Sequence, residues 1–138
     1  MRILDFLIYY TALYFTRNSR LLTWSTAVER ACYAASIATA FWLMTIYAIV
    51  NIFRKTMADL PTVPLLIAGF ILLFLYQYIY ISRKRYELIT SVEYKEFNLS
   101  YKSGMIIILL FYVISFILPF ALATYIGIIH KQYPYLIR

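Results

Sequence analysis

Very few side chains in this sequence could take part in catalysis or hold a metal ion. His130 is the single histidine and Cys32 the single cysteine, whereas a metal site needs several such ligands close together. Asp5 and His130 lie at the ends of apolar segments, and no ionisable residue lies in the middle of one. A buried charge in a membrane is usually kept for function. We therefore expect a protein that is not an enzyme and has no metal and no cofactor.

A run of tyrosines beside basic residues is the second feature that could have a chemical role. It extends from Tyr76 to Tyr86 and encloses the sequence Ser-Arg-Lys-Arg. Aromatic stacking and positive charge could hold a lipid or nucleotide head group, although the same composition commonly anchors a helix end at a membrane boundary. Anchoring is the favoured interpretation. The candidate contacts for a head group or ligand are Tyr80, Arg83, Lys84 and Arg85.

Small residues recur at helical spacing near the start of the longest apolar segment. They are Ala27, Ala31, Ala34, Ala35 and Ala38. Small side chains on one helix face let another backbone approach closely, and such faces drive helix association in lipid. The pattern predicts a helix-packing face that is used either within one chain or between copies of it. Ala123 and Gly127 offer a lesser face of the same kind.

The elements that carry these residues are apolar throughout. Hydrophobic residues make up 64% of the chain and charged residues 14%, against about 45–50% and about 25% in an ordinary globular domain. Residues 31–53, 64–82 and 105–129 carry no charge, and each is long enough to cross a hydrocarbon core of about 30 Å. The sequence predicts an all-α integral membrane protein with one domain over residues 1–138. Its transmembrane helices are expected at about 27–53, 64–82 and 105–129.

The N-terminal apolar segment, residues 3–16, is shorter and includes Asp5. As a helix it would extend about 21 Å, which favours a helix lying in or dipping into the interface over a short fourth span. Tyrosines at positions 9, 10 and 14 suit the head-group boundary. Both alternatives stay open at this stage.

Local signals indicate where the helices begin, end or bend. Thr26 and Glu29 form a capping box, which predicts a helix that begins near Thr26. Residues 83–104 are expected to form a helical connection that ends near Gly104. Pro119 lies inside the last predicted span, where it removes one backbone hydrogen bond and is a candidate hinge.

Basic residues outnumber acidic ones by 13 to 6. Such an excess can indicate nucleic-acid binding, but in a membrane protein it marks the cytoplasmic ends of helices, so we expect no nucleic-acid partner. Three spans place nine basic residues on one side and four on the other, and four spans place eight and five. Both arrangements put the 83–104 connection in the cytoplasm and the C-terminus outside. The expected location is a plasma membrane or a bacterial inner membrane.

Three classes of function are compatible with these features. The first is a self-associating, non-catalytic membrane protein, a homo-oligomer that forms a channel or pore or disturbs the bilayer as an effector. The second is a structural or anchoring subunit of a larger membrane complex. The third, a small carrier or lipid-binding protein, is disfavoured because no charge lies within a span and no repeat is present. The expected partners are the bilayer, and further copies of the chain or other membrane subunits.

Overall fold

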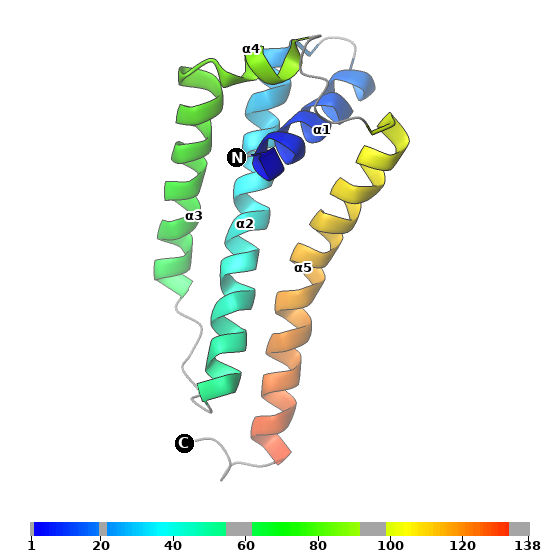
Figure 1. Cartoon of the computed structure of the whole chain (residues 1–138). Helices are drawn as coiled ribbons and strands as arrows, with labels where there is room; N and C mark the ends of the chain where they lie inside the picture. Colours follow the sequence, from blue (N-terminus) through cyan, green and yellow to red (C-terminus); the bar gives the residue numbers. More distant parts are fainter. Residues whose placement is uncertain (1, 20–21, 55–61, 92–98, 133–138) are drawn as a thin grey trace.

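The computed structural model describes residues 2–19, 22–54, 62–91 and 99–132, and all regular structure in these ranges is helical. The helices, in chain order, are α1 (Arg2–Asn18), α2 (Trp24–Arg54), α3 (Thr62–Gln77), the π-helix η1 (Tyr78–Ser82), α4 (Arg85–Thr90) and α5 (Tyr101–Gln132). Figure 1 shows α2, α3 and α5 running alongside one another, with α1 crossing them obliquely near the end where α4 lies. The prediction of an all-α bundle is confirmed at this level.

Helix α2 is the centre of the bundle. Both α3 and α5 pack along it, and within the described ranges the backbones of α3 and α5 do not approach each other closely. Phe41 of α2 packs against Phe116 of α5, with ring centroids 4.7 Å apart and the ring planes tilted by 47°. On the α3 side, Gly69 lies opposite Ala40. The bundle is therefore open on the side between α3 and α5.

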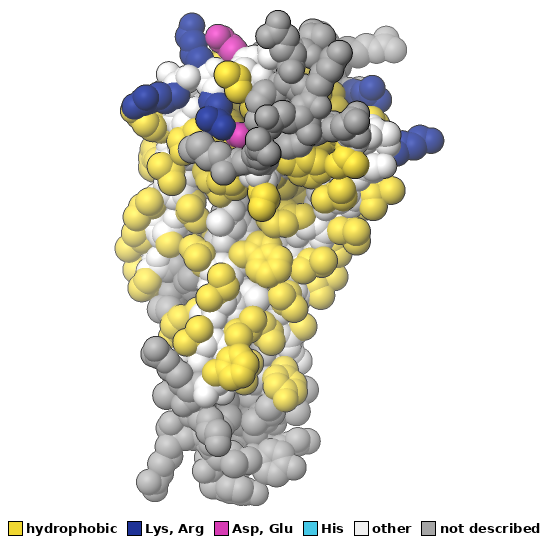
Figure 2. Space-filling view, in the orientation of Figure 1, with side chains coloured by type: hydrophobic (Ala, Val, Ile, Leu, Met, Phe, Trp, Pro, Cys, Tyr) yellow, Lys and Arg dark blue, Asp and Glu magenta, His cyan; other side chains and the backbone are white. Residues whose placement is uncertain are grey.

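Two of the helices are long and apolar enough to cross a membrane, namely α2 over Trp24–Phe53 and α5 over Tyr101–Ile126. Only 22% and 17% of their most apolar segments are buried inside the protein, whereas the core helices of a water-soluble domain are largely covered. Helix α3 is shorter, and it reaches Ser82 only because η1 continues it. Figure 2 shows that hydrophobic side chains cover much of the surface below the α4 end.

Hydroxyl side chains cap the two longest helices. Helix α2 begins at Trp24 because the Oγ1 atom of Thr23 accepts a hydrogen bond from the backbone N–H of Thr26 at 3.4 Å. The start expected near Thr26 is thus two residues late. The capping residue is Thr23, and Thr26 provides the backbone N–H that donates to Thr23. Ser100 does the same for Ser103 at the start of α5.

The predicted helical connection over residues 83–104 differs from the structure at both ends. Helix α4 occupies only Arg85–Thr90, and α5 already begins at Tyr101. Gly104 lies inside α5 rather than at a helix end, and its missing side chain leaves room for the ring of Tyr10, which a Cβ atom would overlap. Glycine is needed here for close packing and not for termination. The part of the predicted connection over residues 92–98 lies outside the described residues.

Candidate functional site

The end of the bundle where α1 and α4 meet contains the most organised polar contacts. The chain reaches it through η1, where the N–H of Arg83 donates to the carbonyl of Tyr78 at 3.0 Å, a π-type bond. Lys84 then adopts a left-handed conformation with φ of 51° and directs the chain into α4. This turn carries Tyr80 inward and leaves Arg83 and Lys84 exposed.

The centre of the site is a buried carboxylate, Asp5, which is only 1% exposed. Arg85 donates to it twice, from Nε to Oδ1 at 2.9 Å and from the terminal Nη2 to Oδ2 at 2.7 Å. The hydroxyl of Tyr80 donates to Oδ1 at 2.8 Å. A bidentate arginine contact of this length is a strong, geometrically defined interaction. The three side chains join α1, η1 and α4, and we refer to them as the Asp5 cluster.

Further hydrogen bonds attach α1 to the beginning of α5. The hydroxyl of Tyr10 donates to the backbone carbonyl of Leu99 at 2.9 Å, and Thr11 and Tyr112 share a hydrogen bond of 3.1 Å. Burial, with a smaller effect of the adjacent Tyr9, raises the pKa of Tyr10, so that its hydroxyl stays protonated and available as a donor. Helix α1 is thus held at several points along its length.

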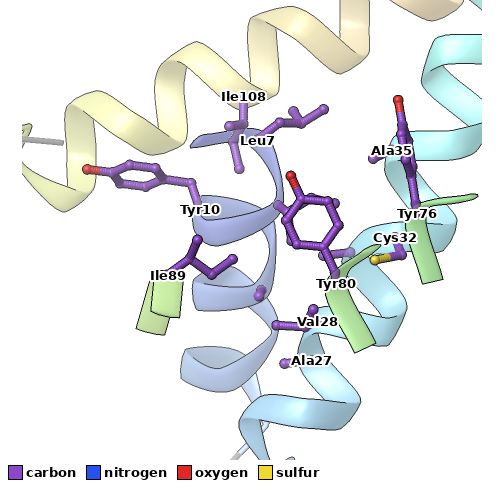
Figure 3. Close-up of a cluster of buried hydrophobic side chains, with 13 residues drawn as sticks. Leu7, Tyr10, Ala27, Val28, Cys32, Ala35, Tyr76, Tyr80, Ile89 and Ile108 are labelled. Carbon is purple, nitrogen blue, oxygen red and sulfur yellow. The ribbon is translucent and has the colours of Figure 1, made fainter. Parts of the chain in front are cut away.

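An apolar cluster packs beneath these polar contacts and includes most of the predicted small-residue face. Ala27, Ala31, Ala35 and Ala38 are fully buried, whereas Ala34 is partly exposed. Helix α1 makes its most extensive contact with α2. Figure 3 shows the cluster on two sides of α1, with Tyr80 and Val28 on one side and Tyr10 and Ile89 on the other. The structure therefore places this face against other helices of the same chain.

The structure separates the four candidate head-group contacts into two pairs. Tyr80 and Arg85 belong to the Asp5 cluster, and Tyr80 is 2% exposed. Arg83 and Lys84 lie at the surface, where Arg83 packs over the ring of Tyr78 and Lys84 is 3.7 Å from Glu87. Arg83 and Lys84 are thus the two exposed candidates, whereas the side chain of Arg85 is 30% exposed.

The other predicted site residues are placed as follows. Pro119 is buried, and α5 continues through it, so its proposed role as a hinge stays a prediction. Ala123 is exposed, while Gly127 and His130 lie in α5 at positions whose burial the structure does not describe. In the part of the chain that the structure describes, no group of three His, Cys, Asp or Glu side chains could hold a metal ion.

Sequence analysis missed the pairing in the Asp5 cluster. Asp5 is a lone acid in an otherwise apolar segment, and that pattern alone favours a paired, buried carboxylate over a solvated one. The partner was harder to predict, because Arg85 lies 80 residues away in sequence and directly follows two other basic residues, Arg83 and Lys84. In these contacts the carboxylate of Asp5 accepts, and the side chains of Arg85 and Tyr80 donate, so the arrangement connects α1 with η1 and α4.

Comparison of the chain with protein-family models, with curated proteins and with solved structures found no match.

Proposed function

We propose that this protein is a non-catalytic structural subunit of a membrane complex. In this proposal α2, α5 and the continuous α3–η1 unit cross the bilayer. The α3–η1 unit covers residues 62–82, which is about 30 Å of helix. Large apolar side chains are exposed along it, including Phe70, Phe74 and Leu66 at 60% or more, and a water-soluble monomer rarely exposes such a continuous surface.

The observation that carries the proposal is the way the Asp5 cluster fixes the end of the bundle. Helices α1 and α4, which we call the cap, are joined through the contacts of Asp5 with Arg85 and Tyr80. Leu88 on the outer face of the cap is 55% exposed, next to the charged pair Lys84 and Glu87. A fixed surface with an exposed apolar side chain and a polar rim is typical of a protein interface.

A pore-forming or membrane-disturbing homo-oligomer is less well supported by the geometry. The small-residue face that favoured self-association packs against helices of its own chain. Several hydroxyls at depth donate to carbonyls of their own helix, as Thr45 does to Phe41 and Ser115 to Phe111. Hydroxyls bonded in this way are less available to line a water-filled path.

Site-specific photo-crosslinking in the native membrane tests the proposal. A photoreactive amino acid at Leu88 should yield one protein adduct of defined mass, whereas the same group at Phe74, 68% exposed on α3, should react with lipid. Induced expression should leave the membrane potential unchanged, as read with a potential-sensitive dye. Depolarisation without any protein adduct at position 88 would contradict the structural role and favour the effector class.

A further inference from the structure

A cavity of about 370 Å³ lies beneath the N-terminal half of α1. Its wall includes Leu4 and Leu7 of α1, Trp42 of α2, Tyr76 of α3, and Ile107 and Phe111 of α5. The volume is within the range of about 300–1,000 Å³ that is usual for small-molecule sites. An apolar cavity excludes water but accepts apolar molecules.

The position of the cavity determines what can enter it. Helix α1 forms its roof on the side of the cap, α2 forms its back, and α5 forms one flank. On the remaining side α3 contributes Tyr76, and the backbones of the described parts of α3 and α5 do not approach each other closely. If the bundle crosses a membrane as proposed above, this open side faces the hydrocarbon of the bilayer, so that an occupant enters laterally from the lipid.

Charge at the cap indicates which lipid would be preferred. Among the described charged side chains at this end, six are basic and three are acidic. The basic ones are Arg17, Arg30, Arg83, Lys84, Arg85 and Lys102, and the acidic ones are Asp5, Glu29 and Glu87. Figure 2 shows basic side chains around this end of the molecule. A phospholipid whose acyl chain lies beneath α1 has its head group near this positive potential, which favours a negative head group.

We propose that the cavity is a binding site for one acyl chain of an anionic phospholipid. This inference depends on the membrane placement in the proposed function but not on any protein partner. The apolar wall binds the chain, α1 closes the site towards the membrane surface, and the basic cap attracts the head group.

Tryptophan fluorescence gives a direct test because the chain has only two tryptophans. In a Trp24→Phe protein, Trp42 in the cavity wall is the single reporter. The protein is placed in phosphatidylcholine vesicles that contain, as a minor component, either phosphatidylglycerol or phosphatidylcholine with brominated acyl chains. Brominated phosphatidylglycerol should quench Trp42 more strongly. Equal quenching by the two lipids would overturn the anionic assignment.

Two variants at adjacent positions distinguish lipid bound in the cavity from lipid that contacts the outer surface of the helices. Ile107 lines the cavity and is 45% exposed, whereas Ile106 is 58% exposed and is not part of the wall. Ile107→Phe should overfill the site and weaken occupancy by roughly fivefold or more, so that quenching of Trp42 falls. Ile106→Phe should leave it unchanged. Identical quenching in both variants would overturn the site.

A control on α3 distinguishes failure of the site from failure of the membrane placement. Phe74→Trp in a protein that lacks both natural tryptophans should be quenched by either brominated lipid, because Phe74 is exposed on the outer surface. Absence of quenching at position 74 would overturn the membrane placement itself. Quenching at position 74 together with an unquenched Trp42 would overturn the acyl-chain site alone.

Discussion

At Asp5, one carboxylate connects three parts of the chain through side-chain contacts of 2.7 to 2.9 Å. Burying a charge is costly, and the cost is offset only where geometry and hydrogen bonding are good. The bidentate contact with Arg85 and the phenol of Tyr80 provide both. The same physical rule predicts that loss of one partner leaves an uncompensated charge in an apolar environment.

Asp5→Asn should therefore destabilise the protein by about 3 kcal/mol, because the partly buried Arg85 loses its bidentate ion pair with the Asp5 carboxylate. Thermal unfolding in detergent, followed by circular dichroism, measures the effect. Glu87→Gln is the control, since Glu87 pairs with Lys84 at the exposed surface, where an ion pair contributes about 0–1 kcal/mol. Equal stabilities of the two variants would show that the cluster does not hold the cap.

Two glycines in helix interiors, Gly69 and Gly104, should respond to alanine with opposite signs. Gly104→Ala should destabilise the protein by about 1–3 kcal/mol, because the new Cβ overlaps the ring of Tyr10. At Gly69 a Cβ would meet that of Ala40 at 3.6 Å, an ordinary contact. Gly69→Ala should therefore stabilise α3 by up to about 1 kcal/mol. Thermal midpoints that shift in the same direction would contradict this assignment of Gly104.

At the scale of the elements, the long helices were largely predictable and their mutual arrangement was not. Charge-free stretches indicated the segments that became α2, α3–η1 and α5, because apolar length is a local property. The alanine spacing indicated a packing face because helical spacing is also a local property of the sequence. The partner of that face depends on tertiary contacts, and in the structure it includes α1, a segment for which two placements were open.

Local signals were ambiguous where one residue type serves two purposes. Thr23 and Thr26 can both cap a helix, and the structure uses Thr23 as the cap and Thr26 as its partner. Gly104 resembled a helix end because glycine is common just beyond helix ends, but it serves close packing with Tyr10. Only the contact partners distinguish these alternatives, and they are distant in sequence.

Ala35→Leu should lower the stability of the single chain, because Ala35 is fully buried in the cluster formed with α1 and η1. Overpacking of this kind costs about 1–3 kcal/mol. The matched control is Ala123→Leu on the exposed surface of α5, which should have little effect. The mass of the detergent-purified particle should stay the same in both variants. A loss of mass in Ala35→Leu would instead place this face between chains.

At the scale of the whole molecule, six basic side chains lie at the end of the bundle that carries the cap, and the sequence predicts that this end lies on the cytoplasmic side of the membrane. The orientation itself stays a prediction. The predicted orientation follows from the excess of basic side chains at the cap end of the bundle. The same excess favours an anionic lipid near the cap, so one charge asymmetry underlies both predictions.

Cysteine labelling in intact cells tests the orientation. In a Cys32→Ala background, Glu87→Cys on α4 and Arg17→Cys at the end of α1 should both resist a membrane-impermeant thiol reagent, whereas Arg138→Cys should react. Membrane disruption should make positions 17 and 87 reactive, which confirms that both are accessible from the other side. Labelling of position 87 from outside would reverse the orientation.

The separation of 80 residues between Asp5 and Arg85 also has a consequence for biosynthesis. At about 5–20 residues per second, Arg85 is made roughly 4 to 16 s after Asp5. During this interval α1 exists without its main polar partner, while α2 and α3 are still being completed. Helix α1 is thus among the first segments to be made, but Asp5 can form its contacts only after η1 and α4 have been synthesised. The docking of α1, an early segment of the chain, is therefore a late step in the assembly of the cap.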